Sequence, residues 1–312
     1  MVDILLVILL AGLFYALGRS ADWAVIHLRA IAEKLGIKIY FLGFILGAFT
    51  SLPELMVSIN ATIKGVASVS VGNLLGGIFV AFGLILGVSL ILNRRVQTDG
   101  QMSNFIPVMV LMVLPLFLGM DGFISVVDGA IMVLGYLGVL VFLYKHNQHL
   151  ELPKLEIFSK KDISRHVFFA VAGVLLVLLF SDLAIRTTLV LMADYHVSAL
   201  IIGLLVYSIG TNLPEIIITF RSWRRHIREL SVGHLTGSAM ANIFILGLLA
   251  FLNPVHLATD LSFIFLAILM IAMLTLVTVF YRTEKSLTRR EGIILLALYV
   301  CFVVTQISFR AL

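Results

Sequence analysis

Charged residues are scarce in this chain of 312 residues, and apolar residues are abundant. Asp, Glu, Lys and Arg together make up only 12% of it, whereas apolar residues make up 61%, and the mean hydropathy is +1.12. Soluble proteins average about 25% charged and about 45–50% apolar residues. A soluble globular domain is therefore excluded, and the sequence predicts an integral membrane protein.

Cysteine and enzyme signatures are also lacking. The single cysteine, Cys301, can form no internal disulfide and fits no metal-ligand spacing, so we interpret it as a packing residue. The sequence contains no HExxH or GxSxG motif, and we expect neither enzymatic activity nor a cofactor. The net charge of +5 forms no basic stripe interleaved with aromatic residues, so no nucleic-acid partner is expected. The expected partners are metal cations as substrates and the lipid bilayer, and homo-oligomerisation stays open.

Long apolar runs fill most of the chain. Runs of roughly 17–25 apolar residues are typical of membrane-spanning helices. We therefore predict an all-α polytopic membrane protein with ten transmembrane helices, the first of which is a retained span because no cleavage signal follows it. The predicted spans are 2–33, 36–61, 66–92, 104–119, 122–144, 166–193, 196–221, 230–252, 258–281 and 292–310.

Basic residues gather on one side of this predicted topology. The connections after the odd-numbered spans, beginning with Arg19 and Arg29, hold nearly all of them, which leaves only Lys64, Arg186 and Arg310 on the other side. Basic residues stay preferentially in the cytoplasm. The sequence therefore predicts a protein of the cell membrane (inner or plasma membrane) with both termini outside.

An internal repeat divides the chain into two halves. At an offset of 161 residues, TSLPE (50–54) aligns with TNLPE (211–215), and SVGNLLG (70–76) aligns with SVGHLTG (231–237) without a gap. Between residues 50–81 and 211–242, nine of 32 aligned positions are identical, and these identities cluster in the two polar patches. Each half holds five spans, an odd number, so the second half crosses the membrane in the opposite sense. We predict a first five-helix repeat at 1–145 with its motif at 47–81, a cytoplasmic connector at 146–165, and an inverted second repeat at 166–312 with its motif at 208–242.

The repeated motifs place a proline and a glutamate inside apolar spans. Pro53 and Pro214 lack an amide hydrogen and release backbone carbonyls, which survive in a membrane only beside a polar cavity or a ligand. A carboxylate in this setting costs a few kcal/mol or more. Antiparallel copies of one unit would bring Glu54 and Glu215 together near the midplane, where one cation between them removes their repulsion. The pattern predicts a cation site.

The other polar residues of the two motifs supply hard oxygen donors, which suit Na⁺ or Ca²⁺. Besides Glu54 and Glu215, the candidate metal ligands are Thr50, Ser51, Asn73, Thr211, Asn212, Ser238 and Asn242. His234 either hydrogen-bonds within the bundle or acts as a proton-linked group, since an unperturbed histidine has a pKa of about 6.5. The spacing of Gly72 and Gly76 indicates helix packing, and Asp182 and Arg186 have the spacing of a structural ion pair.

These motifs resemble the alpha repeats of the sodium/calcium exchangers, which belong to the calcium:cation antiporter superfamily. TSLPE and TNLPE are each followed by a Gly-Asn/His-x-x-Gly turn, and GRSADWAVIHLRAIAEKLGIK is similar to the end of that family's first span. The resemblance implies direct ligation of the ions by Glu54 and Glu215, with help from Thr50, Ser51, Thr211 and Asn212. It also implies alternating access, in which the first and sixth spans slide past the other eight.

The chain departs from the family pattern at several ligand positions. Gly77, Ile78 and Ala81 stand where the first repeat of the family has serine and two polar residues. In the second repeat, Ala239 and His234 replace expected polar residues, while Ser238 and Asn242 are retained. We therefore describe the chain as a divergent member that has lost several oxygen donors.

The functional hypothesis is secondary active antiport of Ca²⁺ against Na⁺ or H⁺. Two carboxylates balance one Ca²⁺, two Na⁺ or two H⁺, whereas an empty doubly charged site is penalised for crossing the apolar barrier. Two alternatives stay open. One is another divalent cation with proton coupling, and the other is a non-transporting membrane scaffold or sensor that retains a cation site.

Overall fold

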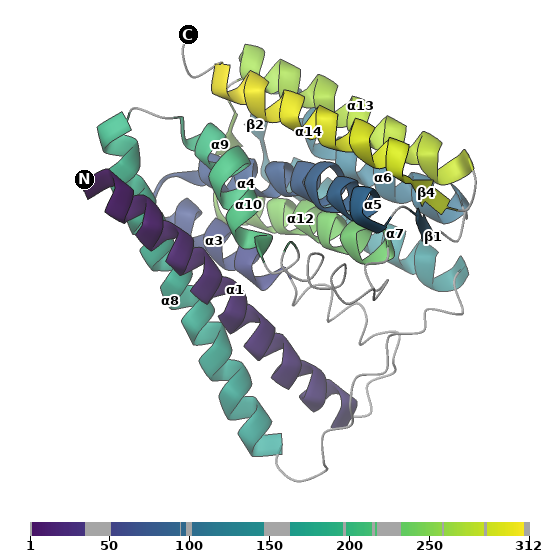
Figure 1. Ribbon diagram of the computed structural model, residues 1–312. Helices are drawn as coiled ribbons and strands as arrows, with labels where there is room; N and C mark the ends of the chain where they lie inside the picture. Colours follow the sequence, from purple (N-terminus) through teal and green to yellow (C-terminus); the bar gives the residue numbers. More distant parts are fainter. Residues whose placement is uncertain are drawn as a thin grey trace.

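The structure is a computed structural model of the chain. It describes residues 2–34, 51–93, 95–97, 102–146, 163–195, 198–213, 216, 232–257, 259–283 and 286–308. Helices account for most of these residues, as the long apolar runs predict. The mainly helical membrane fold expected from the sequence is therefore present, and it is shown in Figure 1.

The helices follow one another in two series. The first series is α1 (Val2–Lys34), α3 (Leu52–Ile63), α4 (Ala67–Phe79), the π-helix η1 (Val80–Leu86), α5 (Gly87–Asn93), α6 (Met102–Leu118), the short 3₁₀-helix η2 (Gly119–Asp121) and α7 (Val126–His146). The second is α8 (Ile163–Tyr195), α9 (Ala199–Ile202), the π-helix η3 (Gly203–Tyr207), α10 (Ser208–Thr211), α12 (Val232–Leu252), α13 (Leu261–Thr283) and α14 (Arg289–Ser308).

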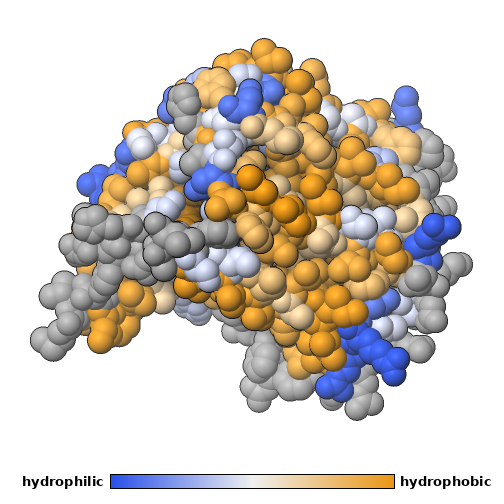
Figure 2. Space-filling model, turned by 90° about the horizontal axis from the view of Figure 1, so that it is seen from above, coloured by the Kyte–Doolittle hydropathy of each residue, from blue (hydrophilic) through white to orange (hydrophobic). Residues whose placement is uncertain are grey.

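Seven helices in the described part of the chain are long and apolar enough to cross a membrane. Three further apolar helices, Leu52–Ile63, Phe105–Asp121 and Ala199–Thr211, are shorter. Seen from above, the surface is mainly hydrophobic, and hydrophilic residues form small groups mostly toward its edges (Figure 2). An integral membrane protein has this distribution because its flanks face lipid rather than water.

Short strands are a feature that the all-α prediction did not include. Strand β1 (Arg95–Gln97) pairs antiparallel with β4 (Ser286–Thr288), and β2 (Phe123–Ile124) pairs antiparallel with β3 (Val255–His256). Each pair joins a connection of the first helical series to a connection of the second. Pairing satisfies backbone groups where the chain leaves a helix, and two or three residues are too few for a strand signal in the sequence.

Helices α1 and α8 form a long antiparallel pair along one flank of the molecule (Figure 1). Both contain 33 residues, and their ends differ by 161 residues, the offset that aligns the two sequence motifs. Gly173 of α8 lies against Ala24 of α1, with no room for a side chain between them. The two helices share a hydrophobic cluster with parts of α3 and η3, while the remaining helices surround a second, larger cluster.

Glycines allow a close crossing between the first series and the second. A Cβ atom on Gly72 of α4 would lie 2.3 Å from the carbonyl oxygen of Leu200, and one on Gly203 of η3 would lie 2.3 Å from that of Val69. Only glycine permits two backbones to approach in this way. The packing interpretation of Gly72 is therefore confirmed, and the crossing holds α4 against the segment that leads to Thr211.

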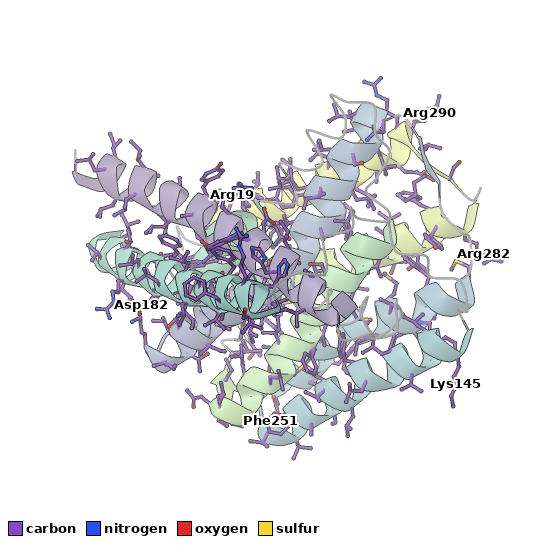
Figure 3. The ribbon with its side chains drawn as sticks, turned by 90° about the horizontal axis from the view of Figure 1, so that it is seen from below. Arg19, Lys145, Asp182, Phe251, Arg282 and Arg290 are labelled. Carbon is purple, nitrogen blue, oxygen red and sulfur yellow. The ribbon has the colours of Figure 1, made fainter. Side chains whose placement is uncertain are left out.

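Charged residues separate toward two ends of the molecule. Figure 3 places Lys145, Arg282 and Arg290 at one end and Asp182 toward the other. The charge count assigned Arg19 and Arg29 to the connection after the first span, but both lie inside α1, whose bounds agree with the predicted span 2–33. Arg19 forms an ion pair with Asp22 at 3.7 Å. The first helix continues past this pair because arginine and alanine are good helix formers.

Candidate functional site

The first motif begins helix α3. Ser51 precedes the helix, Pro53 lies in its first turn, and the amide of Leu55 donates a hydrogen bond of 3.0 Å to the carbonyl of Ser51. Proline is tolerated in a first turn, because the amide hydrogen it lacks would have no helical partner there. Pro53 thus favours the start of α3 at this position of the chain. Ser51 and Glu54 are both buried, and the Glu54 side chain is only 3% exposed.

Placement of Glu54 in the first turn has an electrostatic consequence. The amide groups at a helix N-terminus carry partial positive charge, which favours a nearby carboxylate. The N-terminus of α3 therefore offsets part of the free energy that it costs to bury the Glu54 carboxylate in apolar surroundings. A cation bound to this carboxylate would reduce that cost further.

The second motif repeats the hydrogen bond with which the first motif begins α3. The amide of Ile216 donates to the Asn212 carbonyl at 3.1 Å, at the positions that correspond to Leu55 and Ser51. Helix α10 ends at Thr211, and Asn212 follows as its C-cap. The Thr211 hydroxyl donates to the Tyr207 carbonyl at 3.0 Å, and the Asn212 amide donates to the Ser208 carbonyl at 2.8 Å. The π-helix η3 immediately precedes this segment, and π-helical turns often occur at functional sites. The polar side chains of the motif are therefore held by their own helical turn.

A hydrogen bond joins the two halves at this point. The Thr211 hydroxyl shares its one hydrogen between the Tyr207 carbonyl and the side-chain oxygen of Asn73 on α4, which lies 3.1 Å away. The amide nitrogen of Asn242 on α12 donates to the carbonyl of Leu74 on α4 at 3.1 Å. Helices α4, α10 and α12 meet in the interior of the bundle (Figure 1). Three of the predicted ligands, Asn73, Thr211 and Asn242, thus lie around one helix.

Gly77 provides the space in which these groups meet. A Cβ atom at Gly77 would lie 2.6 Å from the amide nitrogen of Asn242 and 3.6 Å from that of Asn212. Any side chain at this position would therefore collide with the Asn242 amide.

The cluster is closed to solvent and has uneven hydrogen bonding. Asn73, Thr211, Asn212 and Asn242 are at most 4% exposed, and Ser238 of α12 is 9% exposed. Within the part of the chain that the structure describes, the amide nitrogen of Asn73 and the side-chain oxygen of Asn242 are buried without a hydrogen-bond partner. A buried polar atom in this condition costs about 1–3 kcal/mol. The Asn242 oxygen is a hard donor of the kind that Na⁺ and Ca²⁺ take as ligands.

Several predicted site residues lie outside the described part of the chain. They are Thr50, Pro214, Glu215 and the side chain of His234. The expected meeting of Glu54 and Glu215 therefore stays a prediction from the repeat.

The structure adds three residues that the sequence analysis did not select, Tyr207, Thr188 and Phe14. The Tyr207 hydroxyl of η3 hydrogen-bonds that of Thr188 on α8 at 2.8 Å, and Phe14 of α1 packs edge-on against the Tyr207 ring at 5.0 Å. The Phe14 ring also covers Gly210, where a Cβ atom would lie 2.5 Å from it. Both long helices thus contact the segment that carries Thr211. The sequence holds no signal for these contacts because Phe14 and Thr188 sit in ordinary apolar surroundings.

Comparison with known proteins places the chain in a family. The family described as "Sodium/calcium exchanger protein" matches residues 5–145 and 165–308. The sodium/calcium exchanger MaX1 of Methanosarcina acetivorans is 24% identical over 97% of this chain and 99% of its own length. An uncharacterized membrane protein of Methanocaldococcus jannaschii is also 24% identical, over 90% of this chain and 91% of its own length.

A solved structure agrees with this assignment at the level of the fold. The sodium-calcium exchanger NCX_Mj, soaked with 100 mM Na⁺ and 10 mM Sr²⁺, superposes with a TM-score of 0.64 at 24% identity. The superposition covers 96% of this chain and 99% of the NCX_Mj chain. The chain therefore belongs to the sodium/calcium exchanger family of membrane cation antiporters.

Proposed function

We propose that the protein exchanges Ca²⁺ for Na⁺ or H⁺ by alternating access. The observation that carries the proposal is the buried polar cluster around Gly77, to which both halves contribute side chains. Buried polar groups in an apolar bundle cost stability and serve no packing purpose. Their concentration at the two repeated motifs supports a path for ions rather than a scaffold.

The proposed site consists of oxygen donors from both motifs. Glu54 and Glu215 bear the charge, and the neutral ligands are Thr50, Ser51, Asn73, Thr211, Asn212, Ser238 and Asn242. Two carboxylates are balanced by one Ca²⁺, two Na⁺ or two H⁺. An exchange cycle follows, because the loaded site crosses the membrane interior more readily than the empty, doubly charged one.

The proposed architecture is ten spans in two inverted repeats, with both termini outside the cell. The equal lengths of α1 and α8 at an offset of 161 residues support the repeat. The strands support it as well. In the two helical series, β1 corresponds to β3, and β4 corresponds to β2. A two-fold axis in the membrane plane would therefore superpose the pair β1–β4 on the pair β3–β2. The gathering of basic residues at one end supports the orientation (Figure 3).

Reconstitution into liposomes tests the proposal. Purified protein should catalyse ⁴⁵Ca²⁺ uptake that depends on an outward gradient of Na⁺ or of H⁺, and Glu54→Gln should abolish it. Asp128→Asn is the matched control, because Asp128 only caps the start of α7 through Ser125. No uptake under either gradient would contradict antiport and favour a non-transporting scaffold or sensor.

The same assay separates the two counter-ions. If His234 is the proton-linked group, uptake should follow the pH gradient, and His234→Asn should make it insensitive to that gradient. Uptake that follows Na⁺ alone, and is unchanged in His234→Asn, would assign His234 a structural role. Replacement of ⁴⁵Ca²⁺ by Mn²⁺ or Sr²⁺ in the same liposomes tests whether another divalent cation is preferred.

A further inference from the structure

Asp182 of α8 binds two basic side chains at once. Its carboxylate accepts from the Lys64 ammonium at 2.5 Å and from the Arg186 guanidinium at 2.6 Å. Arg186 lies one turn further along the same helix, which is the ion pair that the spacing predicts. Lys64 comes from the turn that ends α3, in the other half of the chain. The carboxylate therefore connects α8 to α3.

The ion pairs of Asp182 account for two of the three basic residues that depart from the predicted charge distribution. Only Lys64, Arg186 and Arg310 fall on the side of the membrane that has few basic residues. Two of these three bind the same carboxylate. An isolated charge near the apolar region would be costly, so each of the three groups depends on the others.

A second polar contact joins the same two helices. The Asn60 amide of α3 donates to the hydroxyl of Ser181 on α8 at 2.5 Å, and Ser181 is fully buried. Asn60 precedes Lys64 by one helical turn, and Ser181 is the neighbour of Asp182. Two adjacent turns of α3 are thus attached to two adjacent residues of α8. Glu54 lies in the first turn of α3, at the opposite end of that helix from Lys64.

We propose that the Lys64–Asp182 pair, with Asn60–Ser181, is a latch that holds one conformation of the transport cycle. The proposal rests on the proposed function, and on the movement that the family resemblance implies, in which the first and sixth spans, here α1 and α8, slide past the other spans. Arg186 belongs to α8 and stays with Asp182 in any rigid movement of that helix. Lys64 belongs to the stationary part and is left behind when α8 shifts by about one turn, or about 5 Å.

The two cations therefore have different roles toward one carboxylate. Lys64 stabilises the latched state through its ion pair with Asp182. Because this ion pair is broken in the other state, it contributes to the free-energy difference between the two states. Arg186 keeps Asp182 neutralised while the latch is open, so the barrier to opening stays low. Asp182 and Lys64 are positioning residues, because they act through α3 on Glu54 and touch no ion.

Removal of the lysine charge tests the latch. The measured quantity is the ratio of the Ca²⁺ affinities on the two membrane faces, which a loss of folded protein alone would not change. Lys64→Gln should change the ratio of the apparent Ca²⁺ affinities on the two membrane faces by about five-fold or more. The ratio is measured in right-side-out and inside-out vesicles, per molecule of folded protein. Lys64→Arg keeps the charge and should keep the ratio. An unchanged ratio in Lys64→Gln would overturn the proposal.

Cross-linking provides the second test. In a Cys301→Ser background, Asn60→Cys with Ser181→Cys should form a disulfide that stops exchange, and dithiothreitol should restore it. The matched control is Thr62→Cys with Ser70→Cys, whose hydroxyls lie 3.4 Å apart on α3 and α4. Both of those helices belong to the stationary part, so that disulfide should leave exchange intact.

The outcomes separate the two proposals. Exchange at the parent rate with the Asn60–Ser181 disulfide closed would show that α8 does not move against α3, and would overturn the latch alone. No exchange in the reduced Cys301→Ser parent, with folded protein present, would contradict the proposed function itself.

Discussion

The hydroxyl of Thr211 and the side-chain oxygen of Asn73 lie 3.1 Å apart, and they come from opposite halves of the chain. Thr211 belongs to TNLPE of the second repeat, and Asn73 belongs to SVGNLLG of the first. The first polar patch of one half therefore meets the second polar patch of the other. This contact joins the two repeats through one residue from each.

Loss of the Thr211 hydroxyl should weaken both stability and ion binding. Thr211→Val keeps the shape of the side chain but removes the donor to Asn73, which leaves a buried amide oxygen with one fewer partner. We expect the free energy of unfolding to fall by about 1–3 kcal/mol, together with a higher KM for Ca²⁺. Thermal unfolding in detergent and ⁴⁵Ca²⁺ flux measure the two effects.

The control for this change is Thr278→Val. Thr278 makes only a hydrogen bond to the Leu274 carbonyl of its own helix, at 2.7 Å. The control should alter neither the melting temperature nor the KM appreciably. Equal effects of the two substitutions would remove the special role given to the contact between the halves.

A side chain at position 77 should destabilise the protein through Asn242. In Gly77→Ser the new Cβ atom would meet the Asn242 amide nitrogen at 2.6 Å, which is closer than real contacts allow. We expect a loss of about 1–3 kcal/mol, as for other overpacked positions. Asn242→Ala in the same chain should recover most of the melting temperature, because it removes the atom that collides.

Gly138→Ala is the matched glycine control, since no atom lies within 4 Å of a Cβ atom at that position. It should be neutral or slightly stabilising, because alanine favours a helix over glycine by about 1 kcal/mol. A Gly77→Ser variant that melts at the parent temperature would contradict the packing argument.

The contact between α1 and the second motif should depend on the ring of Phe14. Gly210→Ala would place a Cβ atom 2.5 Å from that ring and push α1 away from α10. We expect slower exchange and a lower melting temperature. Phe14→Leu should be tolerated better in the Gly210→Ala chain than in the parent. A double-mutant cycle on the melting temperature measures this coupling, and strictly additive effects would argue against it.

Charge balance predicts that exchange is close to electroneutral. Gly77 and Ala81 offer no side-chain oxygen, so the site has fewer ligands than the family pattern would give for additional Na⁺. In the proposed site with two carboxylates, one Ca²⁺ should exchange against two monovalent cations. A potassium potential set with valinomycin should therefore change the rate little. Strong acceleration by one sign of the potential would require a further charge in the cycle.

The distribution of apolar residues was sufficient for the membrane fold, because a spanning helix must satisfy its backbone internally and cover its flanks with apolar side chains. The repeat was visible because polar residues are conspicuous in such surroundings. The charge count placed Arg19 and Arg29 in a connection although the predicted span 2–33 contained both, and α1 contains both. The strands β1 to β4 gave no signal, because pairs of two or three residues depend on which loops are brought together.

The sequence by itself determined that this chain lies in a membrane, that it carries the motifs TSLPE and SVGNLLG in two similar copies, and that these motifs hold polar residues with hard oxygen donors. These properties are local, since each follows from composition or from the order of residues within a short window. Only the tertiary structure decided that Asn242 fills the space left at Gly77, that Phe14 covers Gly210, and that Lys64 reaches Asp182. Such contacts join residues far apart in the chain, and the packing of whole helices, rather than any local preference, sets their distances.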